Sequence, residues 1–290
     1  MDSDVDVRDD VLKIDTLVRQ QFAALRGVFE FPRVAVVGPA GSGKTLLAIW
    51  RLQALLEDGK KAMYVCFNSK LAESLKSRNP DYAEAITNVD KLFAGLCPTA
   101  RSSGDSSVYF RETLPALALA VAETIEDHAK YDAIIVDEGQ DFNEDRLYVL
   151  YELLKNKGSD WIFFSDRRQD LFQSGSGEAF GADVVFQLHH NCRNTQRVNR
   201  ATNQYLGSSP IQSMPGMPEG ELPNVLYCSS KESMATRAWE LASQWSSEQG
   251  VVILSPYTLS NSCMSNCTKG HSLTLTENLT DLGKKGFVYF

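Results

Sequence analysis

The sequence lacks any long uninterrupted run of hydrophobic residues. The longest run, at 116–122, has seven residues, whereas a helix needs about 18 or more to span a bilayer. This shortage argues against a membrane protein. The first ten residues are acidic and lack both the basic start and the apolar stretch of a targeting signal, so we expect a cytoplasmic protein.

Basic residues are fewer than acidic ones, and the cysteines show no paired pattern. The chain has 29 Lys and Arg against 37 Asp and Glu, a net charge of -8, so any contact with nucleic acid must come from a local groove. Six cysteines are spread mostly through apolar stretches, and we expect them to be reduced. Cys263, Cys267 and His271 recur every four residues, but Gly270 interrupts a helix there and a fourth ligand is missing, so packing is favoured over zinc.

The remaining composition is that of a globular protein. With 290 residues, 43% of them hydrophobic and 23% charged, the chain fits one large domain or two modest ones. Apolar, β-rich runs alternate with helical patterns, which predicts an α/β fold with a parallel sheet covered by helices on both faces. These predicted strands lie at 34–37, 62–67, 133–136, 161–164 and 184–188.

Two polar stretches interrupt this pattern. Small polar residues between 98 and 112 predict a small insertion in the first domain, and a segment rich in Gly, Pro and Ser at 207–223 predicts a linker. A second α/β unit is expected to begin after this linker. Its predicted elements are a strand at 224–228, a helix at 231–248 and a strand at 251–254.

The strongest motif is GPAGSGKT at 38–45, which matches G-x-x-x-x-G-K-[ST] between a predicted strand and a predicted helix at 46–56. Glycines let backbone N–H groups form a nest for phosphate, and the helix N-terminus attracts negative charge. A glycine-rich turn with a chance lysine is the alternative, which the strand and helix context disfavours. We expect Lys44 to reach the β- and γ-phosphates and Thr45 to ligate Mg²⁺. The candidate nucleotide-binding residues are Gly38, Pro39, Ala40, Gly41, Ser42, Gly43, Lys44 and Thr45.

A second motif, YDAIIVDEGQDF, supplies carboxylates for such a site. The apolar run ends at Asp137, so this carboxylate is expected at the carboxyl edge of the sheet, where it suits a Mg²⁺ shell. Glu138 can orient and deprotonate a water for attack on the γ-phosphate. The alternative for Glu138 is a solvated carboxylate at a strand end. The acid pair favours hydrolysis over nucleotide storage.

Taken together, GPAGSGKT and DEGQD resemble the paired motifs of the UvrD/Rep-like superfamily 1 helicases, which are P-loop NTPases. SDRRQ at 165–169 and NCRNT at 191–195 resemble the third and fourth motifs of that family. This resemblance implies that Gln169 senses the γ-phosphate and that Arg193 contacts it. An upstream glutamine that recognises adenine in the family would be Gln21, with Gln20 as a competitor.

The stretch MYVCFNSKLAESL at 63–75 resembles motif Ia of the same family. The resemblance implies that Asn68 lies near single-stranded nucleic acid, and Lys70 is a candidate for the groove beside it. A solvated charged face is an equally good interpretation of Lys70. The implied partner is single-stranded nucleic acid, DNA more than RNA, and the implied cofactor is Mg²⁺ with ATP.

The resemblance also implies a domain plan. A lead-in helix is expected at 1–30, a RecA-like ATPase domain at 31–206 and a partial second RecA-like domain at 224–290. Family motifs V and VI are not found, so the motor is expected to be completed by a missing C-terminal half or by a protein partner. A fragment of a longer protein and a natural short relative both fit.

Two functions follow from these motifs. The first is a nucleic-acid-dependent ATPase of helicase type, with turnover that rises with single strands. The second is a nucleotide-gated binding or regulatory module with little or no hydrolysis. A small-molecule kinase ranks last, because nothing in the sequence is typical of an acceptor-binding lid.

Overall fold

The structure is a computed structural model, and it divides into two compact units, Met1–Pro223 and Asn224–Phe290. None of the helices in the described part of the chain is long and apolar enough to cross a membrane. The described residues are 16, 19, 23, 26–98, 106–166, 180–205, 210–245, 251–267, 269–270, 272–278 and 287–290.

The first unit contains a six-stranded sheet. Its strands are β1 (Arg33–Val37), β2 (Ala62–Cys66), β3 (Ile86–Asn88), β4 (Ala133–Asp137), β5 (Asp160–Ser165) and β6 (Val184–Gln187). They are hydrogen-bonded in the order β3-β2-β4-β5-β1-β6, and every pairing is parallel. The predicted α/β class is confirmed. Strand β3 was not predicted, because three residues are too few to give a recognisable pattern.

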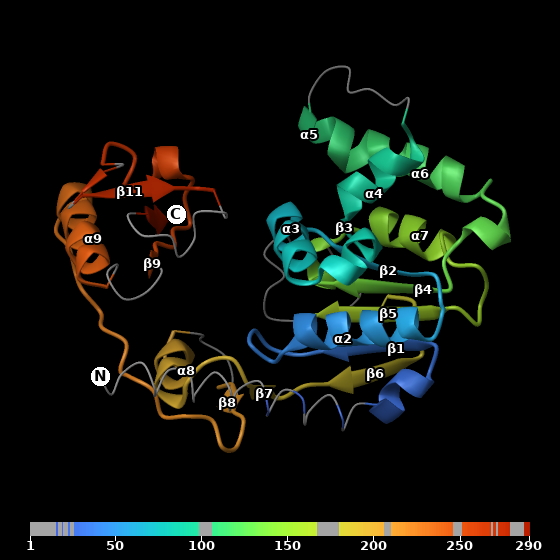
Figure 1. The fold of residues 1–290 in the computed structure, drawn as a ribbon, viewed down its shortest axis with the longest axis horizontal. Coiled ribbons are helices and arrows are strands. Elements are labelled where there is room, and N and C mark those ends of the chain that lie inside the picture. Colours follow the sequence, from blue (N-terminus) through green and yellow to red (C-terminus); the bar gives the residue numbers. More distant parts are fainter. Residues whose placement is uncertain are drawn as a thin grey trace. The chain divides into compact units, whose positions relative to one another are not determined.

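Helices cover both faces of this sheet (Figure 1). Helices α2 (Lys44–Glu57) and α3 (Ser69–Arg78) pack on one face. Helices α4 (Val89–Leu96), α6 (Leu114–Ala122) and α7 (Glu144–Glu152) pack on the other face. The remaining elements are the helices α5 (Ser106–Val108) and α8 (Gln196–Asn203), the π-helical turn η3 (Tyr109–Thr113), and the 3-10 turns η1 (Arg26–Glu30), η2 (Pro80–Ala85), η4 (Asp127–Ala129) and η5 (Gly139–Asp141).

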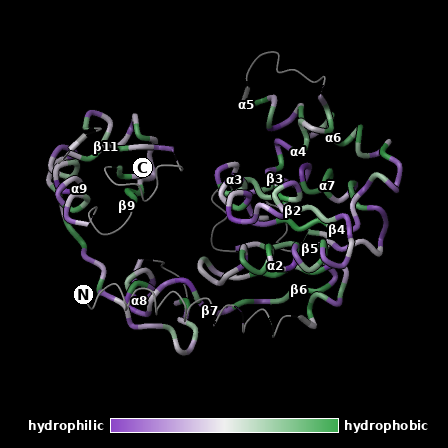
Figure 2. The backbone as a smooth tube through the Cα atoms, in the orientation of Figure 1, coloured by the Kyte–Doolittle hydropathy of each residue, from purple (hydrophilic) through white to green (hydrophobic). Residues whose placement is uncertain are grey.

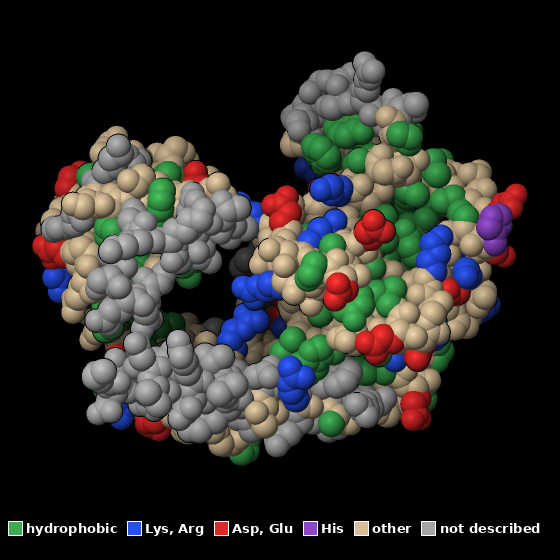
Figure 3. Space-filling view, viewed as in Figure 1, with side chains coloured by type: hydrophobic (Ala, Val, Ile, Leu, Met, Phe, Trp, Pro, Cys, Tyr) green, Lys and Arg blue, Asp and Glu red, His purple; other side chains and the backbone are tan. Residues whose placement is uncertain are grey.

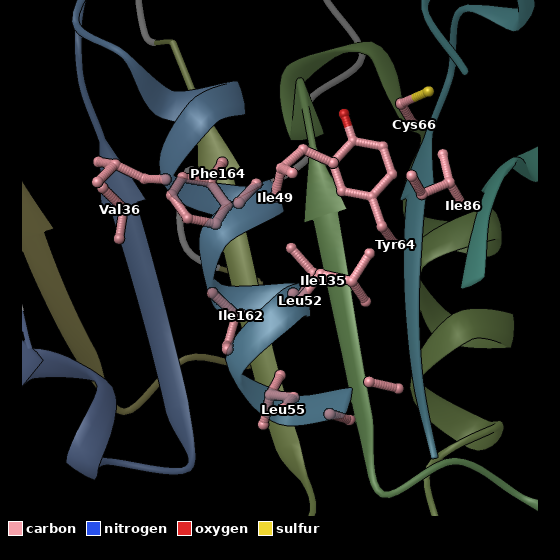
Figure 4. Packing of buried hydrophobic residues seen from close by; sticks show 14 of the residues in the cluster. Val36, Ile49, Leu52, Leu55, Tyr64, Cys66, Ile86, Ile135, Ile162 and Phe164 are labelled. Atoms are coloured by element: carbon pink, nitrogen blue, oxygen red, sulfur yellow. The ribbon is translucent and has the colours of Figure 1, made fainter. Parts of the chain in front are cut away.

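Burial on both faces explains why the central strands are apolar at consecutive positions. Along β1, Val34 and Val36 face α2, whereas Ala35 and Val37 face the opposite helix layer. This is the alternation that a pleated strand imposes. The central strands carry the hydrophobic colour in Figure 2, and Figure 4 shows side chains of α2 packed against β1, β5 and β4.

One charged side chain is buried in the second helix layer. The guanidinium of Arg146 on α7 donates to the Asp90 carboxylate at 2.8 Å and to the Phe110 carbonyl at 2.7 Å, and it lies 4.9 Å from the centre of the Phe67 ring. Arg146 is 7% exposed. It therefore joins α7 to α4, to η3 and to the loop that follows β2.

The structure is less regular at the predicted margins of this unit. Of the lead-in helix predicted at 1–30, residues 16, 19 and 23 are helical. Within the predicted insertion, 99–105 lie outside the described residues. The stretch predicted as a linker contains β8 (Gln212–Ser213), which pairs in parallel with β7 (His190–Asn191), and it buries Ile211 and Met217.

The second unit has a four-stranded sheet in the order β10-β11-β12-β9. Its core gathers around Trp239 on α9, which lies with Met264 and Val288 in one buried cluster. The predicted strand at 224–228 is wrong: these residues form no regular element, and Tyr227 is 93% exposed. The elements are α9 (Lys231–Trp245), β9 (Val251–Val252), η6 (Leu259–Asn261), β10 (Lys269–Gly270), β11 (Leu273–Thr276) and β12 (Phe287–Tyr289).

Candidate nucleotide site

The loop between β1 and α2 has the backbone of a phosphate cradle. Gly41 and Gly43 have φ angles of 78° and 86°, a left-handed conformation that favours glycine. At Gly38 a Cβ atom would lie 2.7 Å from the Leu188 Cβ and 2.8 Å from the Ser42 Oγ. The glycines of the motif are therefore required by the conformation and the packing of this loop.

Side chains inside the loop fit a phosphate group. The Lys44 ammonium donates to the carbonyls of Gly38 at 2.9 Å and Pro39 at 3.2 Å, and its Nζ lies 3.9 Å from the Asp166 Oδ2. Lys44 is 5% exposed, so its charge is held in the loop rather than in solvent. The Ser42 hydroxyl is buried and has no hydrogen-bond partner among the described residues. A cation and an unsatisfied buried hydroxyl are groups that phosphate oxygens satisfy.

The acid pair lies at the carboxyl edge of β4, beside this loop. Asp137 is fully buried, and its carboxylate accepts hydrogen bonds from the Tyr64 hydroxyl at 2.7 Å and from the Thr45 side chain. Burial, and then the charge of Glu138, raise the pKa of Asp137 to about 6, against the lowering effects of Tyr64, Thr45 and Lys44. A carboxylate and a hydroxyl are hard oxygen ligands of the kind that Mg²⁺ prefers, so Asp137 and Thr45 fit the predicted cation.

Glu138 follows in a tight turn. Its φ and ψ angles are 52° and 46°, the left-handed region that is strained for a residue with a side chain. The Gln140 amide donates to the Glu138 Oε2 at 2.7 Å, and the Gln140 Oε1 accepts from the Asp166 backbone N–H at 2.9 Å. Gly139 packs so closely on Phe163 that a Cβ there would lie 2.2 Å from the ring. The turn is thus held by the hydrogen bonds of Gln140 and by the packing of Gly139 against Phe163.

Asn191 holds the phosphate loop from the other side. Its Nδ2 donates to the Ala40 carbonyl at 3.2 Å, and its Oδ1 accepts from the backbone N–H groups of Arg193 at 3.0 Å and Asn194 at 2.9 Å. Next to it, the Cys192 N–H donates to the Gly41 carbonyl at 2.9 Å. One amide side chain therefore orients both the loop and the turn that carries Arg193.

A small cavity brings these groups together. Glu138 comes from the turn after β4, and Arg193 comes from the segment after β7. They line the cavity with six residues of the loop, which are Ala40, Gly41, Ser42, Gly43, Lys44 and Thr45. Gly38 and Pro39 lie at the start of the same loop, where their carbonyls hold Lys44.

The predicted nucleic-acid residues lie at the start of α3. The Asn68 Oδ1 caps this helix by accepting from the N–H groups of Lys70 at 2.9 Å and Leu71 at 3.2 Å, and the Lys70 side chain is exposed. Figure 3 shows basic side chains interspersed with acidic ones over this face. The geometry of Asn68 is therefore that of a helix cap.

Two predicted residues, Gln21 and Gln169, lie outside the described residues. Tyr64, Gln140, Asp166 and Asn191 also enter the site, although sequence reasoning assigned them no role. Gln140, Asp166 and Asn191 lie inside motifs in which neighbouring residues were assigned the roles. Tyr64 gives no signal, because it is one aromatic residue in an apolar strand, and only the pairing of β2 with β4 brings it to Asp137.

Residues 21–174, more than half of the chain, match the protein family described as the AAA domain. The chain belongs to the AAA domain family. This match spans the phosphate loop, the acid pair and five of the six strands of the first sheet. The first unit has a P-loop NTPase fold, in which the phosphate loop joins β1 to α2 beside a parallel sheet. No curated protein matches the sequence.

Several solved structures show a weak likeness to this AAA domain protein. AMPPCP-bound DnaA from Aquifex aeolicus is 10% identical with a TM-score of 0.33, over 66% of this chain and 50% of that chain. Bacteroides Pif1 bound to single-stranded DNA is 17% identical with a TM-score of 0.31, over 58% and 40% of the two chains. A DNA replication initiation factor is 12% identical with a TM-score of 0.32, over 59% and 45%. This chain spans half or less of these proteins, and the likeness is too weak to transfer their functions.

Proposed function

We propose that this chain is a Mg²⁺-dependent ATP hydrolase whose turnover responds to single-stranded nucleic acid. The observation that carries the proposal is the cavity in which Lys44, Thr45, Glu138 and Arg193 converge. A cation-bearing phosphate loop supports nucleotide binding, and a carboxylate facing the same cavity supports hydrolysis.

Each residue has a role that its position supports. The Lys44 ammonium and the loop N–H groups bind the β- and γ-phosphates. Asp137 and Thr45 hold Mg²⁺, which when bound neutralises charge on the phosphate oxygens. Glu138 accepts a proton from the attacking water, and Arg193 faces the negative charge that develops on the γ-phosphate.

Dependence on nucleic acid is the finer part of the proposal. It is supported by the motif resemblance around Asn68 and by the exposure of Lys70 at the start of α3. With a net charge of -8, the chain offers no general attraction for polyanions. We therefore expect a short contact with a single strand, and DNA is the first strand to test.

The test is the steady-state ATPase rate with and without single-stranded DNA or RNA. Glu138→Gln keeps the size of the side chain and removes the base, so turnover is expected to fall by about 10²–10⁴-fold while ATP binding persists. Lys44→Ala is expected to weaken ATP binding itself. Glu144→Gln, at an exposed position on α7, is the matched control and should leave the rate unchanged.

Each result separates the candidate functions. Turnover that rises with single strands and disappears in Glu138→Gln supports the proposal. ATP binding without turnover would refute hydrolysis and favour a nucleotide-gated binding module. An ATPase rate that does not change when single-stranded nucleic acid is added would support hydrolysis and would refute the proposed nucleic-acid dependence.

A further inference from the structure

Gln140 is a buried polar side chain that the proposed chemistry does not use. It lies in the turn after β4 and is 7% exposed. Both ends of its amide make contacts inside the site: Nε2 donates to the Glu138 Oε2 at 2.7 Å, and Oε1 accepts from the Asp166 N–H at 2.9 Å. A buried amide whose two ends form hydrogen bonds to two different segments fixes the distance between those segments.

The contacts of Asp166 extend this connection to the phosphate loop. Asp166 is 1% exposed, and its Oδ2 lies 3.9 Å from the Nζ of Lys44. A continuous chain of contacts therefore runs from Lys44 through Asp166 and Gln140 to Glu138. It joins the cation that is proposed to bind phosphate to the carboxylate that is proposed to act on water, through Asp166, the residue that follows β5.

The backbone of the turn makes this support necessary. Glu138 is held at a φ of 52°, a conformation that is strained for a residue with a side chain and persists only when its surroundings hold it. Its own carboxylate is partly exposed, and Gln140 supplies a hydrogen bond that fixes one of the two carboxylate oxygens. Without that bond the Glu138 side chain has several rotamers available to it.

We propose that Gln140 is a positioning residue that holds the Glu138 carboxylate and ties its place to the backbone of Asp166. The expected effect on kcat rests on the proposed hydrolysis. The expected effect on the structure rests only on the two hydrogen bonds of Gln140. Gln140 does not touch the reacting atoms. Through Gln140, the position of the Glu138 carboxylate depends on the position of Asp166, whose side chain lies beside Lys44.

Two substitutions separate the two ends of the amide. Gln140→Met has nearly the same length and removes both hydrogen bonds. Gln140→Glu keeps an oxygen that accepts from the Asp166 N–H but loses the donor to Glu138. The matched control is Gln53→Met, because Gln53 donates to the Glu57 carboxylate at 2.9 Å on the exposed surface of α2.

We expect both Gln140 variants to lower kcat for ATP by about tenfold or more, with the Kd for ATP within about twofold of the unsubstituted chain. The exchange rate of the Asp166 amide hydrogen, followed by NMR, is expected to rise in Gln140→Met and to stay protected in Gln140→Glu. Gln53→Met should change none of these quantities. A residue with a merely structural role would lower the stability of the chain. It would not lower kcat while leaving the Kd for ATP unchanged, and it would not change the exchange of the Asp166 amide hydrogen alone.

The outcomes distinguish this inference from the proposed function. An unchanged kcat in a folded Gln140→Met chain would overturn the positioning role, and an unchanged Asp166 exchange rate would overturn the tie to β5. If the unsubstituted chain shows no turnover, the proposed hydrolysis fails and with it the kinetic role of Gln140. The amide exchange then still decides whether Gln140 connects the two segments.

Discussion

The contact between Gly139 and Phe163 makes the sharpest prediction about how the acid turn is held. Gly139 lies between the two residues of interest, Glu138 and Gln140, and its Cα faces an aromatic ring of β5. A Cβ added there would lie 2.2, 2.5 and 2.7 Å from three ring atoms of Phe163. The ring is 1% exposed and is stacked on Trp161 with 6.3 Å between centroids, so it has little room to retreat.

The size of the effect follows from these distances. Carbon atoms pack at about 3.5–4.0 Å, so the turn and the ring must separate by roughly 1.3 Å or more in Gly139→Ala. Forcing an additional methyl group into a well-packed core costs about 1–3 kcal/mol. For a unit of this size, 1 kcal/mol lowers Tm by about 2–4 °C, so we expect Tm to fall by roughly 2–12 °C. The displaced turn should also lower ATP turnover more than ATP binding.

The assay is urea and thermal unfolding with a matched control and a double-mutant cycle. Gly95→Ala makes the same change at an exposed position of α4, where nothing lies within 4 Å of the added atom. It should stabilise the chain by about 0.5–1 kcal/mol. Phe163→Leu should recover part of the loss in the Gly139→Ala background, giving a coupling energy of about 0.5–3 kcal/mol. Equal stability of the two alanine variants, or strict additivity with Phe163→Leu, would refute this account of the turn.

Three further predictions concern single side chains. Arg193→Ala should slow ATP hydrolysis on the order of 10³-fold with an unchanged circular dichroism spectrum, and normal turnover would remove Arg193 from the site. Arg146→Met removes a buried guanidinium from the partly exposed Asp90 carboxylate and from the Phe110 carbonyl, and it should lower the free energy of unfolding by about 1–3 kcal/mol. Arg111→Met, whose side chain is 70% exposed, should change it by less than about 1 kcal/mol. Burial, and then the charge of Asp137, raise the pKa of Cys66 to about 12, and its side chain is fully buried, so this thiol is both un-ionised at pH 8 and shielded from solvent. Iodoacetamide should therefore modify the exposed Cys267 first and Cys66 only on unfolding, and early modification of Cys66 by peptide mass spectrometry would contradict this.

The sequence alone determined the α/β class and the location of the phosphate loop. Both depend on local patterns: consecutive apolar residues mark strands that are covered on both faces, and GPAGSGKT encodes a backbone conformation that needs glycine. Asp137 and Glu138 could be placed at a sheet edge for the same reason, since the apolar run of β4 ends there. The roles of these residues remain predictions.

Only the tertiary structure decided what surrounds these residues. Tyr64 meets Asp137 across 73 positions of sequence, and Asn191 meets Ala40 across 151. No local pattern records such a contact, because it depends on the order in which the strands pair. The predicted strand at 224–228 failed for a related reason: β-forming residues make a strand only where a neighbouring strand accepts their hydrogen bonds. The residues that hold the loop and the acid turn are thus set by long-range packing, whereas the residues proposed to bind the nucleotide lie in local sequence motifs.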